Sequence, residues 1–142
     1  MISACLAGVP CRWNKKAATD KQALKILSDG RAFLICPKVM AGLSTPRPAC
    51  EIAGGDGVAV LAGKAKVVDH KGNDYTEYFI KGARKCLLLA KKNKIKKALL
   101  KSGSPSCGAK FIYAGDFSGE KKRGKGVLAA LLAKNKIKLI EK

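Results

Sequence analysis

Apolar positions recur along the chain with the spacing of an amphipathic helix. The strongest pattern runs from Thr76 to Lys92, where apolar side chains fall on one helical face and lysines on the others. This spacing predicts a helix over residues 76–92. Its expected apolar face comprises Phe79, Ala83, Cys86, Leu87 and Ala90.

Two further helices are expected near the ends of the chain. TDKQALKILSDGR predicts a helix that Thr19 caps and Gly30 ends, and GVLAALLAKN predicts another over residues 126–135. In the first of these, the apolar stripe expected to be buried consists of Ala23, Leu24 and Leu27.

Short apolar runs between these helices predict strands. They are MISACLAG at the start, RAFLIC as a buried strand before a proline, IKKALLK, FIYAG and IKLIE. VAVLAGKAKVV, residues 58–68, predicts a β-hairpin, and DHKGND predicts a turn after it. GLSTPRPACEIAGG, residues 42–55, predicts an irregular loop, and such loops on a rigid scaffold often carry functional sites.

Strands and helices alternate, and their connections are long enough for crossovers. This order predicts an α/β fold, a single compact Rossmann-like sandwich with a largely parallel sheet, in one domain over residues 1–142. Ligands in such folds bind beyond the carboxyl ends of the strands. Cys5 closes the first predicted strand, Cys36 closes RAFLIC, and Cys107 follows the predicted strand IKKALLK. If those strands are neighbours, their thiols meet at one edge of the sheet.

The composition is that of a folded chain. Hydrophobic residues make up 47% of the 142 residues, enough for a core, and aromatic residues only 6%, so that core is mostly aliphatic. No apolar run approaches the roughly 20 residues of a membrane span, and the first residues do not resemble a signal peptide. We therefore expect a cytoplasmic monomer with reduced thiols and no membrane partner.

The formal net charge is +19, from 29 Lys and Arg against 10 Asp and Glu. Such a charge favours anionic partners such as phosphates or nucleic acid. A lysine-rich soluble surface explains it equally well, because most of the lysines fall on predicted helix faces and turns.

Six cysteines need an explanation other than disulfides if the compartment is reducing. None forms a C-x-x-C pair, so a zinc ribbon or a ferredoxin-type cluster is not supported. Cys107 lies in the turn SGSPSCG, where a thiol suits a ligand or a nucleophile better than core filling. Three thiolates from separate loops could hold a [4Fe–4S] cluster with one iron open, or a zinc ion.

Three motifs narrow this choice. SACLAGVPCRW, CPKVMAGLSTPRPACEI and LKSGSPSCGAKFIYAGDF together resemble the thiouracil desulfurase (desulfidase) family, and the intervening and closing segments match it in order. The resemblance covers nearly the whole chain. It implies a [4Fe–4S] cluster and a non-redox reaction, in which water replaces the sulfur of a thiolated pyrimidine and hydrosulfide leaves. Family substrates include free thiouracil and thiolated uridine monophosphate.

Carried onto this chain, the resemblance implies that Cys5, Cys36 and Cys107 hold the cluster and that Ser104 handles a proton at the substrate. The family's usual motif is Cys-Pro-Glu, and its glutamate is thought to act in acid/base chemistry. In this chain the third position of the motif is Lys38. A lysine has the opposite charge and an unperturbed pKa of about 10.4, against about 4.3 for Glu. Lys38 is therefore a neutral amine base, an anion-binding group, or the mark of a variant with little activity.

Five residues near these motifs have two interpretations each. Arg12 and Arg47 clamp a phosphate or pin loops. Glu51 assists catalysis or pairs with Arg47, and we favour the pairing slightly. Ser106 binds substrate or caps its turn, and we prefer the cap. Cys11 lines the pocket or replaces Cys36 as a ligand.

The remaining candidates have structural roles. Cys50 is expected in the wall of the site, Cys86 in the core and His70 in solvent.

Two functions follow from these residues. The first is cluster-dependent desulfuration of thiolated uracil or its nucleotide. The second is a basic module that binds a nucleotide or RNA, with the cluster structural, lost or replaced by zinc. Few aromatics and no recognisable RNA-binding motif count against the second.

Overall fold

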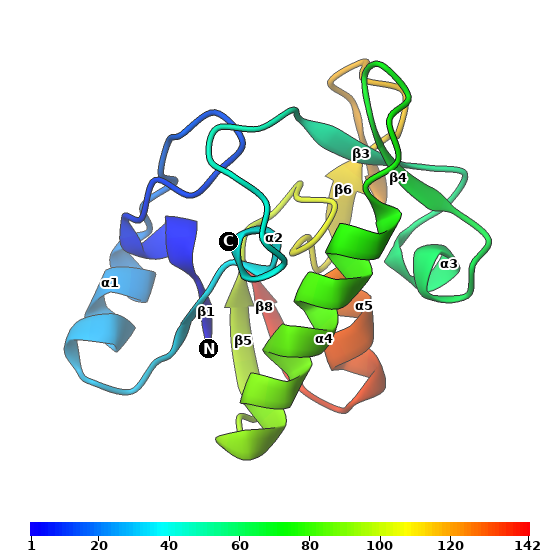
Figure 1. The fold of residues 1–142 in the computed structure, drawn as a ribbon. Coiled ribbons are helices and arrows are strands. Elements are labelled where there is room, and N and C mark those ends of the chain that lie inside the picture. Colours follow the sequence, from blue (N-terminus) through cyan, green and yellow to red (C-terminus); the bar gives the residue numbers. More distant parts are fainter.

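The computed structural model describes residues 1–142 and has one parallel sheet at its centre (Figure 1). Its four strands lie in the order β2, β1, β5, β8, and every neighbouring pair is parallel. The bounds are Leu34–Ile35 for β2, Ile2–Ser3 for β1, Lys97–Leu100 for β5 and Lys138–Glu141 for β8. The predicted α/β class with a largely parallel sheet is confirmed.

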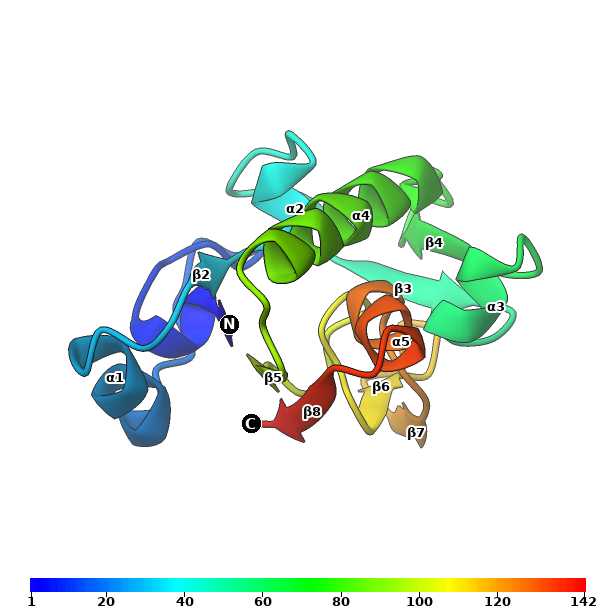
Figure 2. The ribbon, with the colours of Figure 1, turned by 90° about the horizontal axis from the view of Figure 1, so that it is seen from below.

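Helices pack on both faces of this sheet (Figure 2). α4 (Thr76–Lys92) packs against α5 (Val127–Lys134) on one face, and α1 (Lys21–Ser28) lies on the other. Strand β5 contributes buried side chains to both faces of the sheet, because successive side chains of a strand point in opposite directions. Ala98 and Leu100 join the larger core with α4 and α5, whereas Leu99 packs with Ala23 of α1.

Two antiparallel pairs flank the parallel sheet. β3 (Cys50–Ala53) pairs with β4 (Lys66–Asp69), and β6 (Phe111–Tyr113) pairs with β7 (Lys121–Arg123). β3 lies within the stretch predicted to be irregular, and β7 was not predicted. No helix combines the length and apolar character that crossing a membrane requires.

The hairpin predicted over residues 58–68 is wrong in its first half, which forms helix α3 (Gly57–Leu61). Asp56 begins this helix, because its Oδ1 accepts the N–H groups of Val58 and Ala59. The second half becomes β4, which pairs with β3. Helix α4 has the predicted bounds.

Several local predictions also need correction. A 3-10 turn, η1 (Ala4–Ala7), follows the short β1, so the first strand is shorter than expected. Asp20 rather than Thr19 caps α1, since Asp20 Oδ1 accepts the N–H of Ala23 at 2.9 Å. Of the stripe predicted for α1 only Ala23 is buried, and Leu24 is 41% exposed. β2 is an edge strand, so its Leu34 is 36% exposed.

Helix α2 (Pro37–Met40) follows β2 and lies against α4. The two helices approach closely at Gly82, where a Cβ atom would lie 2.0 Å from the carbonyl oxygen of Pro37. Only a residue without a Cβ fits there. The contact fixes α2, which carries Lys38, at the end of the sheet.

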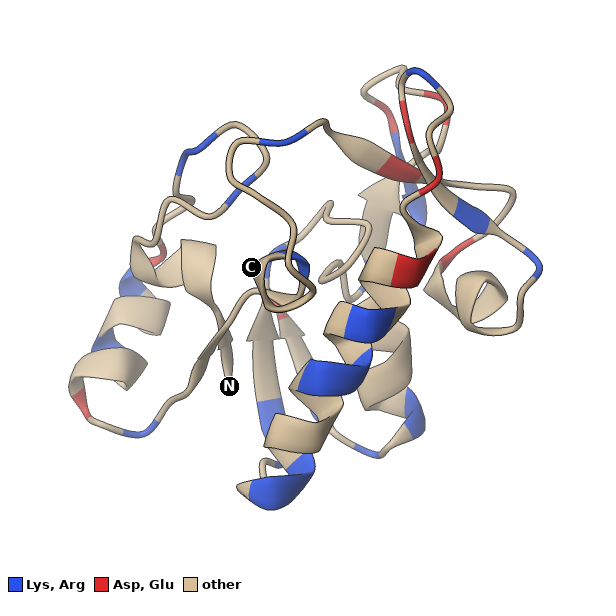
Figure 3. Ribbon diagram, in the orientation of Figure 1, with Lys and Arg blue, Asp and Glu red and all other residues tan.

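Positive charge is distributed over the surface, including the outer side of α4 (Figure 3). The lysines expected to face away from the apolar side of this helix are all exposed: Lys81, Lys85, Lys91 and Lys92.

Candidate metal centre and substrate pocket

A pocket of about 240 Å³ opens at the carboxyl ends of three adjacent strands, β2, β1 and β5. The segments that follow these strands carry Cys36, Cys5 and Cys107, and all three cysteines line the pocket. The volume lies just below the range of about 300–1,000 Å³ usual for small-molecule sites. The parallel sheet thus brings together three thiols that are distant in sequence.

Local backbone structure positions each of these cysteines. Cys5 lies in η1, which Gly8 ends with a φ of 90°. Cys36 precedes α2 as its N-cap residue. Cys107 lies in a turn that Ser104 closes, because Ser104 Oγ accepts the N–H of Cys107 at 3.1 Å and that of Ser106 at 3.2 Å.

Cys11 is a fourth thiol in the same pocket and packs with Cys5 and Cys36. Cys36 Sγ donates to the Cys11 carbonyl oxygen at 3.9 Å. Hydrogen bonding toward Cys11, with burial, raises the pKa of the Cys36 thiol, and a hydrogen bond from Cys11 lowers the pKa of Cys5. Cys5 is therefore the member of this group that loses its proton more readily.

The donor set is compatible with an iron–sulfur cluster. Cys5, Cys36 and Cys107 line the same pocket, and a negative charge on either of the other two would raise the pKa of Cys5. The three cysteines of a cubane bind three different irons, so their sulfurs need not converge on one point. No three His, Cys, Asp or Glu side chains in the chain are arranged to hold a single metal ion. Cys5, Cys36 and Cys107 could each supply one thiolate to a cluster.

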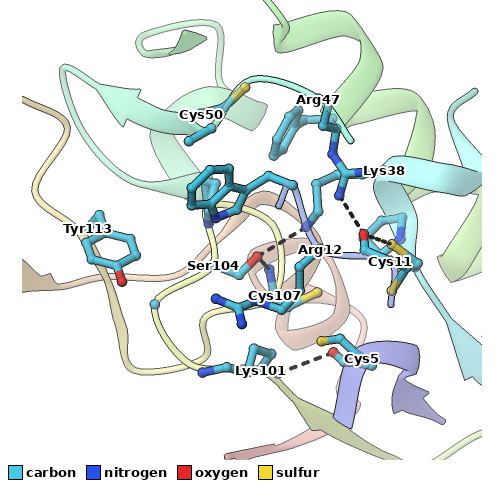
Figure 4. A pocket seen from close by; sticks show the side chains of 18 of the residues that line it. Cys5, Cys11, Arg12, Lys38, Arg47, Cys50, Lys101, Ser104, Cys107 and Tyr113 are labelled. Carbon is cyan, nitrogen blue, oxygen red and sulfur yellow. Dashed lines mark hydrogen bonds between the residues drawn. The ribbon is translucent and has the colours of Figure 1, made fainter. Parts of the chain in front are cut away.

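Lys38 projects from α2 into the pocket (Figure 4). Its Nζ donates to Ser104 Oγ at 3.3 Å and lies 5.8 Å from the centre of the Phe79 ring. Its positive charge acts to lower the pKa of the pocket thiols, Cys5 and Cys36 among them. The replacement of the expected glutamate therefore puts a cation beside both the thiols and the serine.

Arg47 is committed to its own loop and does not pair with Glu51. It is 9% exposed and donates to the carbonyl oxygens of Ser44 and Cys11 and to Thr45 Oγ1. This arrangement fits the loop-pinning role and corrects the favoured salt bridge.

Glu51 is the only acid that lines the pocket. Its Oε2 accepts the N–H of Gly115 at 2.8 Å and of Phe117 at 3.1 Å, while Oε1 accepts no hydrogen bond. One oxygen thus fixes the loop after β6, and the other has no protein partner.

The remaining candidates, Ser106, Cys50, Cys86 and His70, lie in different surroundings. Ser106 is fully buried, does not line the pocket, and its Oγ has no hydrogen-bond partner, so the hydroxyl does not cap the turn as preferred. Cys50 lines the pocket wall, and burial and the charge of Asp69 raise its pKa to about 11. Cys86 is a core residue and His70 is exposed, as expected.

Sequence reasoning missed two lysines of this pocket, Lys101 and Lys121, and its exposed aromatic residues, Trp13 and Tyr113. Lys101 directly follows β5, so the rule that pointed to the strand-end cysteines would have found it. Lys121 belongs to the unpredicted β7 and had no comparable signal.

Fold and site together define a parallel α/β protein with a cysteine-lined pocket at the carboxyl edge of its sheet. The chain matches the 2-thiouracil desulfurase family over residues 1–142 and belongs to that family. It is 46% identical over 132 residues to the uncharacterised protein YbbK of Bacillus subtilis (strain 168). The aligned region covers 93% of this chain and 87% of YbbK.

A solved structure supports the same assignment. The [4Fe-4S]-dependent thiouracil desulfidase TudS superposes with a TM-score of 0.87 at 37% sequence identity, covering 99% of this chain and 88% of TudS.

Proposed function

We propose that this protein removes sulfur from thiolated uracil or thiouridine monophosphate and releases hydrosulfide, with a [4Fe–4S] cluster held by Cys5, Cys36 and Cys107. The observation that carries the proposal is the position of these thiols, which follow three adjacent parallel strands and line one pocket. Family membership supports the same chemistry. We further propose that residues 1–142 act as one monomeric unit in the cytoplasm, because iron-binding thiols must stay reduced.

The cluster would supply a Lewis-acidic iron without a protein ligand, at which a substrate sulfur can bind. Overall, water adds its oxygen to the base carbon, the carbon–sulfur bond breaks, and the sulfur leaves as hydrosulfide. A protein group must therefore accept a proton from water while negative charge moves onto the sulfur.

Ser104 and Lys38 are placed to serve the substrate. Ser104 Oγ accepts from Lys38 and from two backbone N–H groups, and its own O–H donates to no protein atom. That proton is free for an acceptor on the substrate. We propose that Lys38 orients the hydroxyl and offsets the negative charge on the departing sulfur.

Glu51 is the proposed proton acceptor. It is the only carboxylate of the pocket and its Oε1 is unengaged. In this arrangement Glu51 takes over the base role that the family's missing glutamate would have, while its Oε2 keeps the loop in place.

The test is hydrosulfide release from 4-thiouracil and 4-thiouridine monophosphate by protein purified and iron-loaded without oxygen. We expect release by the wild type, loss of iron in Cys107→Ala, and full iron content in Cys86→Ala, whose cysteine lies in the core. Normal cluster loading in Cys107→Ala would contradict the proposed ligand set.

The role of Lys38 is tested by comparing Lys38→Glu and Lys38→Met with the wild type. If Lys38 takes part as proposed, Lys38→Met keeps its iron but releases hydrosulfide more slowly. Activity in Lys38→Glu alone would mean that the scaffold is retained and the chemistry is impaired in the natural sequence.

A second candidate, a nucleotide- or RNA-binding module without turnover, is favoured by the charge of the pocket wall. Five cations line it against a single carboxylate: Arg12, Lys38, Arg47, Lys101 and Lys121. Binding that depends on phosphate contacts weakens steeply with salt. Tight, salt-sensitive RNA binding without any hydrosulfide release would favour this candidate.

A further inference from the structure

The sequence Asn-Lys-Ile-Lys occurs twice in the chain, at residues 93–96 and 135–138. Each copy connects a helix to a strand of the parallel sheet, α4 to β5 and α5 to β8. In both, the amide of the isoleucine donates to a carbonyl oxygen of the last helical turn, at 2.9 Å for Ile95 and 3.1 Å for Ile137. The two helices therefore end in the same Schellman motif.

A lysine occupies the left-handed position of each motif. Lys94 has a φ of 50° and Lys136 a φ of 59°. Glycine or asparagine is the usual residue at this position, because a side chain with a Cβ atom is unfavourable at positive φ. Backbone conformation alone thus favours an uncharged residue at both helix ends, whereas the chain has a cation at each.

The two connections lie side by side, because β5 and β8 are paired and Lys97 is opposite Lys138. They form one surface at the amino ends of these strands, away from the cysteines. Figure 3 shows only blue where α4 ends and β5 begins, and again where α5 ends. This surface, which we call the lysine end, consists of exposed lysines: Lys91, Lys92, Lys94, Lys96, Lys97, Lys134, Lys136 and Lys138.

No acidic residue neutralises the lysine end. The only acids of α4, β5, α5 and β8 lie at the far ends of their elements, Glu77 in the first turn of α4 and Glu141 at the end of β8. None of the three ion pairs of the fold includes a lysine of this surface. Helix dipoles favour the lysines in the last turns, Lys91, Lys92 and Lys134, but do not account for those beyond the helices.

A hollow of about 250 Å³ opens within the lysine end. Its apolar lining consists of Leu87, Ala90, Ile95 and Ile137, and three lysines of the surface line it as well. Ala90 is 1% exposed and Ile137 8%. The apolar lining is therefore recessed among charged side chains that extend into solvent.

We propose that the lysine end is a docking surface for an acidic segment of a partner protein, which inserts one apolar side chain into the hollow and pairs its carboxylates with the lysines. Uncompensated cations attract such a segment and orient it, and a recessed apolar hollow is filled by a protruding apolar anchor. A single-stranded RNA fits less well, because no aromatic ring lines the hollow for a base to stack on. A membrane surface would require apolar side chains that protrude rather than a recessed lining.

The lysine end and the substrate pocket lie at opposite ends of the parallel strands. A docked partner would therefore leave the substrate pocket open. The proposed docking does not depend on the desulfuration proposed above, and its tests need no turnover.

The first test uses fluorescence anisotropy of a short labelled peptide of aspartate and glutamate with one central leucine, added to the full-length protein. A second peptide has serine in place of the leucine. We expect the serine peptide to bind at least about tenfold more weakly, because burial of a leucine side chain contributes a factor of that order. Equal binding of the two peptides would overturn the proposal, since charge alone would then explain the attraction.

A double variant, Lys94→Gly with Lys136→Gly, assigns the binding to the lysine end. It removes two charges and places glycine at the positive-φ positions, so its urea unfolding midpoint should be no lower than that of the wild type. The leucine peptide should bind severalfold more weakly, because an exposed ion pair contributes a factor of up to about five. Wild-type affinity in this variant would overturn the proposal.

Two control variants separate this surface from net charge and from the substrate pocket. Lys21→Gln with Lys25→Gln removes the same charge from exposed positions of α1, and Lys38→Met removes a cation of the pocket. Both should bind the leucine peptide as the wild type does. A loss in either control as large as in the glycine variant would overturn the proposal.

Other polyanions provide the last comparison. Polyuridylate or phosphatidylserine vesicles should bind more weakly than the leucine peptide at the same salt concentration. If either bound more tightly, and lost that affinity in the glycine variant, the lysine end would serve RNA or a membrane and the proposal would be overturned.

Discussion

Replacing Gly82 by alanine should destabilise the protein, although alanine is the better helix former. In α4 an alanine Cβ would lie 2.0 Å from the Pro37 carbonyl oxygen, whereas Cβ atoms in proteins do not approach heavy atoms within 3.0 Å. Helices α2 and α4 must therefore separate by about 1.0 Å at this point, the difference between 3.0 and 2.0 Å. The carbonyl group belongs to the backbone and cannot rotate away as a flexible side chain would.

The magnitude follows from two opposing effects. Overpacking of this kind costs about 1–3 kcal/mol, and replacing glycine by alanine in a helix returns about 0.5–1 kcal/mol. We expect a net loss of about 1–2 kcal/mol in the free energy of unfolding. With a urea dependence of about 2 kcal/mol/M, the middle of the usual range, the unfolding midpoint should fall by about 0.5–1 M.

The assay is urea unfolding of Gly82→Ala beside Lys81→Ala, an exposed neighbour on the same helix whose change should stay within about 0.5 kcal/mol. Because Cys36 and Lys38 flank Pro37, the same displacement should lower iron retention after reconstitution. An unfolding midpoint of Gly82→Ala at or above that of the wild type would refute the reasoning, since helix propensity alone would then decide the outcome.

Three further changes test other parts of the structure. Glu141→Gln should destabilise the protein at pH 7 by about 1 kcal/mol, because three backbone N–H groups outweigh burial and lower the pKa of Glu141. That stabilisation is present above the unfolded pKa and is lost as the pH falls through the folded pKa, so the gap between wild type and variant in thermal melts should close below about pH 4; a gap independent of pH would contradict this. Asp56→Ala should cost about 1–2 kcal/mol in urea unfolding, because it removes the cap of α3 and a bond to the N–H of Lys125, and an unchanged midpoint would argue against a capping role. Glu51→Gln should bind iron normally but lose hydrosulfide release, and undiminished release would exclude Glu51 as the proton acceptor.

The parts of the fold that the sequence predicted correctly are those that follow from regular spacing of apolar residues and from the order of strands and helices. Helix α4 has its predicted bounds because its apolar positions keep a period of 3.6 residues over four turns. The sheet order places β1 between β2 and β5, so the rule that ligands lie at strand ends located Cys5, Cys36 and Cys107 together. Local periodicity combined with one topological rule was sufficient for this part of the site.

What the sequence did not reveal depends on contacts between distant segments. The segment VAVL has strand propensity, yet it forms a helix because Asp56 caps its first turn. The side chain of Asp56 is also held by the N–H of Lys125, which is distant in sequence. Arg47 and Glu51 are close in sequence and opposite in charge, but each binds other partners. Arg47 donates to the carbonyl oxygen of Cys11, and Glu51 accepts two backbone N–H groups from the loop after β6. Lys121 enters the pocket only because β7 folds back on β6.

The distribution of the three cysteines along the polypeptide has a consequence for how the pocket forms. Strand β1, which leads to Cys5, pairs with β2 through Leu34 and with β5 through Leu99. The three thiols therefore lie far apart in the unfolded chain and come together only once these distant segments have paired.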